Sequence, residues 1–448
     1  MRNKGNLSFW QMWNLSFGFL GVQIAYALQS ANISRIFATL GADPHQLSFF
    51  WILPPLMGMI VQPLIGKWSD RTWCRMGRRK PYLLVGAIVA VLVMIFLPNA
   101  GSLNLSTAYV FLGLNAAMWF GLFSLIFLDT SINVAMQPFK MMVGDMVNEE
   151  QKARAYSIQS FLCNAGSLFG YLFPIFFTWI GIANEAPEGQ VPPSVITSFY
   201  VGAAVLIICV LYTFLKVKEM PPAEYAEFHG IADDTVIPSE AKEPDGLLSL
   251  LFKAPRTFWT VGLVQFFCWA AFLYMWTYSN GTLAFNCWGG VTDTASKAYQ
   301  DAGNWVGVAF AVQAVGSILW ATVLPKFKNL KTAYVVSLLI GAVGFAALMF
   351  IHDKYLACAA YFLIGAAWAA MLALPFTLLT NALEGNPHMG SYLGLFNCTI
   401  CLPQIIAAAT GGLVLKLVGG SQATMLGVAG ILLVLGALSV RLIDTKKQ

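Results

Sequence analysis

The feature that most constrains the fold of this chain is a run of about 20 apolar residues that recurs along nearly its whole length. A run of that length allows an α-helix to cross the ~30 Å hydrocarbon core of a bilayer. Of the 448 residues, 58% are hydrophobic and only 10% are charged, against ~25% charged in soluble domains. The runs are long and do not alternate, which excludes a transmembrane barrel built of ~10-residue alternating strands. The sequence therefore predicts an all-α membrane protein.

Polar, Gly/Pro and charged breaks divide the chain into twelve predicted spans. They begin near residues 9, 47, 82, 108, 154, 195, 257, 302, 333, 355, 390 and 421. The fourth run, residues 108–143, is longer than one bilayer crossing needs, so we expect it to protrude or bend. The first run carries Gln11, Gln23 and Gln29 and is too long for a signal-peptide core, so we interpret it as a retained helix.

The basic residues are distributed very unevenly between the two sets of connecting segments. All but four of the 26 lysines and arginines fall in the terminal segments or in loops that follow even-numbered spans. The exceptions are Arg35, Lys297, Lys354 and Lys416. Because cytoplasmic segments are enriched in basic residues, this bias predicts that both termini are cytoplasmic. The net charge of +5 then reflects orientation in the membrane and not nucleic-acid binding. We expect this membrane to be the plasma membrane, which in a bacterium is the inner membrane.

The longest polar stretch, residues 217–256, divides the spans into six plus six. We therefore predict an N-terminal six-helix bundle over residues 1–216, a cytoplasmic central loop over 217–256 and a C-terminal six-helix bundle over 257–448. The lipid bilayer is the expected partner of both bundles, and we expect a monomer.

A weak internal repeat supports this division. Pro138-Phe139 near the end of the fourth span matches Pro375-Phe376 in the tenth, and Val22-Gln23 parallels Val264-Gln265. Parallel repeats of six helices imply two bundles around a central cavity, the arrangement that permits transport by alternating access.

Asp129 is the one aspartate that lies well inside an apolar run, Leu125-Ile126-Phe127-Leu128-Asp129. A carboxylate at the centre of a bilayer helix costs ~2.5 to 3.5 kcal/mol on insertion scales, so such a residue is a functional candidate by default. Removal from water penalises the charged form relative to the neutral acid, so this group can take up and release a proton. The structural alternative is a carboxyl group that binds neighbouring helices together. We predict proton coupling at Asp129.

Helical spacing extends this site along the same face of the fourth span. Asn133, Gln137 and Lys140 follow Asp129 at i+4, i+8 and i+11, which returns each side chain to nearly the same angle. The four residues would form a polar stripe ~16 Å long. We expect this stripe to face a cavity, although hydrogen bonding between helices is an equally good interpretation for Gln137 beside Pro138.

Neutral amides and aromatic side chains gather on several other predicted spans. Amides pair with hydroxyl groups and aromatic faces cover the C–H surface of a sugar, so these residues suit a neutral polyhydroxylated solute. An anionic substrate would require intramembrane basic residues, and only Arg35 and Lys140 come near. For each amide taken singly, helix packing is at least as good an interpretation. The candidate sugar ligands are Gln23, Gln29, Asn32, Asn133, Gln137, Asn164, Trp276, Asn280, Asn397 and Gln404.

The loop after the second span carries basic residues around one aspartate. It contains Gly66-Lys67-Trp68-Ser69-Asp70-Arg71 and, a few residues later, Gly77-Arg78-Arg79-Lys80. A plain cytoplasmic basic cluster is one interpretation. The pattern also resembles the signature loop of the major facilitator superfamily, whose Asp and Arg groups form cytoplasmic interlocks that open and close with transport. This resemblance implies gating roles for Asp70, Arg71, Gly77, Arg78 and Arg79.

The sequence gives no indication of catalytic chemistry. No His/Cys/Asp/Glu cluster has metal-ligand spacing, and no Gly-rich loop follows a strand. Cys398 and Cys401 form a CxxC pattern, but they lie in an apolar run without a histidine. We therefore expect no enzymatic activity, no metal and no cofactor other than a proton as coupling ion.

Further residues resemble a narrower group, the sucrose/proton symporters and their animal and bacterial relatives, of the glycoside-pentoside-hexuronide type. The matching residues include Gly21-Val22-Gln23, Gln62-Pro63, Ser69-Asp70-Arg71, Leu128-Asp129, Asn133, Pro138, Lys140, Gly390, Tyr392, Gly394 and Phe396-Asn397. The resemblance implies the major facilitator fold and proton-coupled uptake of an α-glucosidic disaccharide, with Asp129 as the essential acid. The eighth span, about residues 302–324, lacks the charged residues of plant members, which favours maltose over sucrose.

The sequence thus predicts a secondary active transporter that takes up a neutral disaccharide, maltose or sucrose, by proton symport and alternating access. Sodium-coupled sugar symport is the nearest alternative. A non-transporting sugar sensor and a drug/proton antiporter are others. A membrane enzyme would need an acid/base pair inside the membrane, which this sequence does not have.

Overall fold

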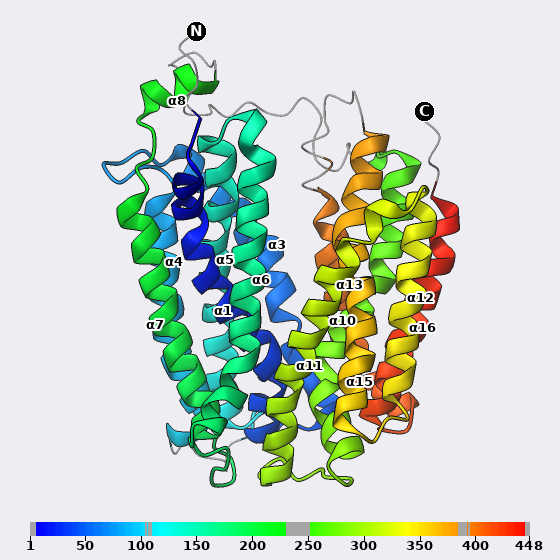
Figure 1. Ribbon diagram of the computed structural model, residues 1–448. Coiled ribbons are helices and arrows are strands. Elements are labelled where there is room, and N and C mark those ends of the chain that lie inside the picture. The colour runs from blue at the N-terminus through cyan, green and yellow to red at the C-terminus, as the bar shows by residue number, and fades with distance from the viewer. Residues whose placement is uncertain are drawn as a thin grey trace. The chain divides into compact units, whose positions relative to one another are not determined.

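The computed structural model describes residues 6–103, 105, 110–229, 251–383, 392 and 395–443. All regular secondary structure in these residues is helical (Figure 1). The chain forms two compact units.

The first unit consists of Met1–Ser30, Met57–Ile182 and Pro193–Ala241. It contains most of α1 (Phe9–Thr39) and of α3 (Leu53–Arg71), together with α4 (Lys80–Phe96), η1 (Leu97–Leu103), α5 (Ala116–Met146), α6 (Glu149–Trp179), α7 (Pro193–Lys216) and α8 (Pro222–His229).

Glycines allow the helices of the first unit to approach one another closely. A Cβ at Gly86 of α4 would lie 2.6 Å from the backbone nitrogen of Ala135 in α5. A Cβ at Gly166 of α6 would lie 2.4 Å from the carbonyl oxygen of Leu20 in α1. Small residues at such crossings are typical of membrane helices, which gain little from hydrophobic burial in lipid and associate through close packing instead. This packing fixes the backbones that carry the polar residues of the unit.

The second unit consists of Ala31–Leu56, Ala183–Pro192 and Lys242–Gln448. Its helices are α2 (Pro44–Phe50), α10 (Arg256–Cys287), α11 (Lys297–Ala321), η3 (Leu324–Lys326), α12 (Leu330–Leu348), α13 (Lys354–Ala382), α15 (Cys398–Leu417), α16 (Gln422–Ser439) and η4 (Val440–Leu442). α10 packs against α16 and α15, and α13 packs against α11 and α12. The short helix α2 packs on α15, where a Cβ at Gly412 would lie 2.2 Å from the carbonyl oxygen of His45.

Eleven segments of the described chain are long and apolar enough to cross a membrane. The helix α1 is not among them because it carries several amides and Arg35, but its 31 residues extend ~46 Å and can cross a bilayer. Together they give twelve long helices, so the predicted all-α membrane fold is confirmed.

Two details of the predicted spans were wrong. The fourth was expected from residue 108, but α5 begins at Ala116 because residues 111–114 form a turn, with positive φ at Leu112 and Gly113, and Asn115 caps the helix. The second was expected as one helix, but the chain turns between α2 and α3.

The predicted domain boundaries stay a prediction. Much of the expected loop 217–256 lies outside the described residues, as does the expected start of the eleventh span near residue 390. The compact units also divide the chain differently, since residues 31–56 and 183–192 belong to the second unit.

Candidate functional site

Asp129 lies in α5 of the first unit and is only 2% exposed. Gln29 of α1 donates its side-chain N–H to Asp129 Oδ1. The other oxygen of each side chain, Asp129 Oδ2 and Gln29 Oε1, is buried and has no hydrogen-bond partner among the described residues. An unpaired carboxylate oxygen away from water is costly, which favours the neutral acid at this position.

A chain of hydrogen bonds leads from the main-chain carbonyl of Asp129, not from its carboxyl group, along α5. Asn133 Nδ2 donates to the Asp129 carbonyl oxygen at 2.8 Å, and Asn133 Oδ1 accepts from Gln62 Nε2 of α3 at 2.6 Å. Gln62 Oε1 in turn accepts from Lys140 Nζ at 3.3 Å. Three members of the predicted stripe are therefore linked, through a residue of α3. Gln137 is half-buried and lies beside Gly66 of α3. A Cβ added to Gly66 would lie 3.8 Å from Gln137 Nε2.

Sequence reasoning missed Gln62 as a member of this site. Its amide in an apolar helix was the available indication, but pairing with Asn133 depends on how α3 packs against α5.

Two further candidate sugar ligands lie in the first unit. Gln23 of α1 is buried near Gly166. Asn164 of α6 is half-buried and donates to the carbonyl oxygen of Ser160, one turn earlier in the same helix, at 2.9 Å. Their role as sugar ligands stays a prediction.

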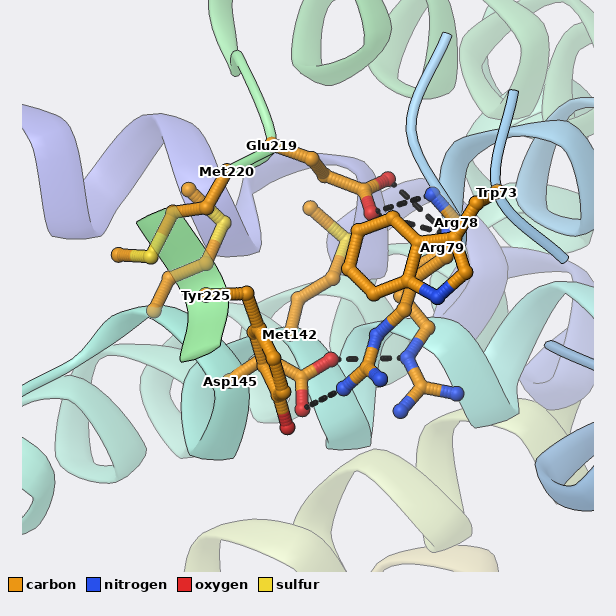
Figure 2. A pocket seen from close by; sticks show the side chains of 9 residues that line it. Trp73, Arg78, Arg79, Met142, Asp145, Glu219, Met220 and Tyr225 are labelled. Atoms are coloured by element: carbon orange, nitrogen blue, oxygen red, sulfur yellow. Dashed lines mark hydrogen bonds and ion pairs between the residues drawn. The ribbon is translucent and has the colours of Figure 1, made fainter. Parts of the chain in front are cut away.

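The basic loop before α4 forms a compact ion-pair cluster (Figure 2). Asp145 at the end of α5 binds both Arg78, at 2.6 Å, and Arg79, at 2.8 Å. The Arg78 guanidinium carbon lies 4.1 Å from the ring centroid of Tyr225 and 5.2 Å from that of Trp73. The charge of Arg78 is thus held by a carboxylate and by two aromatic rings at once.

Glu219 completes the cluster by capping the start of α4. Its carboxylate accepts the backbone N–H groups of Arg78 at 2.8 Å, Arg79 at 3.0 Å and Lys80 at 2.7 Å (Figure 2). An anion is favourable here because the free N–H groups and the positive end of the helix dipole both lie at the N-terminus of a helix. Gly77, at φ +104°, leaves room for this carboxylate, since a Cβ there would lie 2.5 Å from Glu219.

The structure therefore places three of the predicted gating residues, Gly77, Arg78 and Arg79, around Asp145 and Glu219. Arg71 is exposed on the last turn of α3, and the Asp70 side chain lies outside the description. The sequence analysis missed both partner carboxylates, although acidic residues at the ends of spans four and six were the available indication. The gating role of all five residues stays a prediction.

In the second unit, Arg35 is 1% exposed and is surrounded by amide oxygens. It donates to Gln300 Oε1 at 2.7 Å, Asn304 Oδ1 at 2.8 Å and Asn184 Oδ1 at 2.8 Å. Asn184 donates in turn to Asp301 Oδ1 at 2.8 Å. This buried charge is thus solvated by neutral acceptors, with a carboxylate one step further away. The network joins α1 and the 183–192 segment to α11.

The other candidate sugar ligands lie in the second unit. Asn32, Asn280 and Gln404 are buried, and Gln404 donates to the carbonyl oxygen of Ile400 at 3.0 Å. Asn397 is half-buried at the start of α15. Trp276 is stacked on Trp51, with ring centroids 5.9 Å apart. Of all the predicted ligands, the structure brings together Gln29, Asn133 and the acid Asp129.

The chemistry available from these groups is proton exchange at one carboxyl group and hydrogen bonding by neutral amides. Within the described residues, no three His, Cys, Asp or Glu side chains are grouped so that they could hold a metal ion.

Several known proteins with similar sequences are named as sugar transporters. The chain is 25% identical over 434 residues to the sucrose transport protein SUT5 of Oryza sativa subsp. indica, covering 88% of this chain and 79% of that protein. It is 25% identical over 216 residues to the proton-associated sugar transporter A of Rattus norvegicus, covering 48% of this chain but only 28% of the length of that relative.

Solved structures share the fold at lower identity. A D-xylose-proton symporter matches with a TM-score of 0.68 at 15% identity, over 98% of both chains. The nucleoside transporter NupG matches with a TM-score of 0.68 at 14% identity, over 97% of this chain and 98% of that one. The family model for the Major Facilitator Superfamily matches residues 15–408. The protein therefore belongs to the Major Facilitator Superfamily.

Proposed function

We propose that this protein is a proton-coupled symporter that takes up a neutral disaccharide, maltose or sucrose, across the plasma membrane by alternating access. The observation that carries the proposal is the pair Asp129 and Gln29, which shares one hydrogen bond and leaves one buried oxygen on each side chain without a partner in the described chain.

A proton on Asp129 would complete this pair. With a proton on Oδ2, the acid donates to Gln29 Oε1 while Gln29 Nε2 donates to Oδ1, so the acid and the amide are joined by two hydrogen bonds. Without the proton, Oδ2 and Oε1 are both acceptors, and neither has a donor among the described residues. Protonation therefore replaces a buried charge and two unpaired oxygens with a neutral, fully paired unit.

This change can couple proton binding to movement. A transporter that closes around its site must bury whatever that site contains, and a neutral acid–amide pair is far less costly to bury than a carboxylate. Protonation at Asp129 thus favours the closed states through which the sugar passes, and release of the proton on the other side resets the cycle.

The sugar side of the proposal is supported by the neutral amides of both units and by relatives whose names state sucrose and proton-associated sugar transport. The described spans provide amide donors and acceptors for hydroxyl groups, while the buried arginine of α1, Arg35, already has three amide partners.

The test is sugar accumulation by the purified full-length protein in proteoliposomes. With an inward proton gradient and no sodium, the wild-type protein should concentrate labelled maltose or sucrose above the external level. An Asp129→Asn variant should only equilibrate the sugar. Accumulation that requires sodium at constant pH would replace the proposal with sodium symport, and the absence of any sugar movement would contradict it.

A further inference from the structure

One face of α10 carries polar groups without partners next to a series of aromatic rings. Gln265, Trp269, Phe272 and Trp276 follow one another at i, i+4, i+7 and i+11, so they lie on the same side of the helix. Of these, only Trp276 was predicted from the sequence to contact a sugar. The other residues of this face have no assigned role.

The polar groups of Gln265 and Trp269 are buried and unpaired. Gln265 is 0% exposed, yet neither Nε2 nor Oε1 has a hydrogen-bond partner among the described residues, and the same holds for Nε1 of Trp269. Two other indole groups of this unit are paired, since Trp51 Nε1 donates to Ser34 Oγ and Trp320 Nε1 donates to Ser337 Oγ. Buried polar atoms without partners cost free energy and require an explanation, such as a ligand that supplies the missing partners.

The aromatic rings beside these groups are arranged around Trp368 of α13. Trp269 and Trp276 stand nearly perpendicular to Trp368, at 74° and 83°, with centroid distances of 5.7 and 5.9 Å. Trp276 is covered by the parallel ring of Trp51. In the described part of the chain, no ring is stacked parallel on Trp269 or Trp368, and Trp368 is half-buried.

We propose that Gln265, Trp269 and Trp368 form a subsite for one pyranose ring of the transported sugar. The C–H face of the pyranose would lie on an indole face, its hydroxyl groups would pair with both amide atoms of Gln265, and one hydroxyl oxygen would accept from Trp269 Nε1. A site of aromatic walls with a few placed polar groups is typical of small-molecule binding. No charged side chain belongs to this cluster, so it suits a neutral pyranoside. The proposal rests on the proposed function and names the residues that recognise its substrate.

The test uses maltose binding and thermal stability of the purified full-length protein. Gln265→Leu removes two unpaired polar atoms while keeping a similar side-chain volume, and Trp269→Phe removes the unpaired N–H together with one ring. If these atoms serve a ligand, the melting temperature of Gln265→Leu without sugar should stay the same or rise, because no existing hydrogen bond is lost, whereas Trp269→Phe should lose some stability through the cavity that it leaves. The Kd for maltose, from the sugar dependence of the melting temperature, should increase about tenfold or more for Gln265→Leu and several-fold for Trp269→Phe.

Trp320→Phe is the matched control, since its indole N–H is already paired with Ser337 Oγ at 2.8 Å. This variant should lose stability and keep the wild-type Kd. Trp368→Leu removes an indole face and should also weaken maltose binding.

The outcomes separate this inference from the proposed function. If no disaccharide shifts the melting temperature of the wild-type protein, the proposed function and the subsite both fail. If the wild-type protein binds maltose and Gln265→Leu and Trp269→Phe bind it equally well, the subsite is wrong and the proposed function stands. A lower melting temperature with an unchanged Kd would make these residues part of the packing and would also overturn the subsite.

Discussion

At the scale of single residues, the role of Gln29 is the most open to experiment, because its amide is a predicted sugar ligand and also donates to Asp129. Gln29→Leu removes the donor to Oδ1 and the acceptor that a protonated Oδ2 would use. We expect this variant to fold but to lose most sugar accumulation driven by a proton gradient, measured as uptake in proteoliposomes.

The matched control for Gln29 is Gln159→Leu. Gln159 is also a buried amide of the first unit, but it donates to the carbonyl oxygen of Phe139 at 3.0 Å and does not contact the acid. This control should cost stability without changing the ratio of accumulated to external sugar. Equal accumulation by Gln29→Leu and the wild-type protein would contradict the acid–amide pair.

A second prediction at this scale concerns Glu219. Because its carboxylate accepts three backbone N–H groups at the start of α4, Glu219→Ala should reduce the free energy of unfolding by ~1.5 to 3 kcal/mol, measured by thermal or denaturant unfolding. Glu224→Ala is the control, since Glu224 is exposed on α8. If both variants have the same stability, the capping of α4 by Glu219 is not significant.

The sequence could single out Asp129, because one carboxyl in an apolar run stands out without any knowledge of its neighbours. It could not identify Gln29 as the partner, because the two residues are separated by 100 positions and meet only through the packing of α1 against α5. Asp145 and Glu219 were missed for the same reason. Their partners lie in a loop whose basic residues are explained equally well by membrane orientation.

At the scale of elements, Arg35 attaches α1 to α11 through amides where a carboxylate would bind more strongly. Asn304→Asp would give Arg35 a direct counterion in place of a neutral acceptor at 2.8 Å. We expect a higher melting temperature and slower sugar uptake, because a stronger attachment of the 31–56 segment to α11 would be harder to release in each transport cycle.

Arg35→Met provides the opposite test of the same network. It removes the buried cation and leaves the oxygens of Gln300, Asn304 and Asn184 without this donor, so the melting temperature should fall. If Asn304→Asp and Arg35→Met both leave melting temperature and uptake rate unchanged, the network does not hold these elements together.

The elements themselves were largely predictable, because twelve apolar runs with clear breaks give the helices directly. The prediction failed where local turn geometry decides the outcome. Residues 108–114 are apolar, yet the turn at 111–114 delays α5 to Ala116, and no periodicity marks this.

At the scale of the whole molecule, the sequence divides into halves at residues 217–256, whereas the second compact unit includes two segments from the first half. Residues 31–56 and 183–192 come from the first half of the sequence and belong to the second unit. This assignment depends on which ends of the helices pack together, and hydropathy does not carry that information.

The measurement that tests the central claim most directly is sugar-driven proton movement. Proteoliposomes that contain a pH-sensitive dye and no initial pH gradient receive an inward maltose or sucrose gradient. The wild-type protein should acidify the interior as sugar enters. Asp129→Asn should still exchange labelled for unlabelled sugar but leave the internal pH constant. Acidification by Asp129→Asn equal to that of the wild-type protein would contradict the assignment of this residue as the proton carrier.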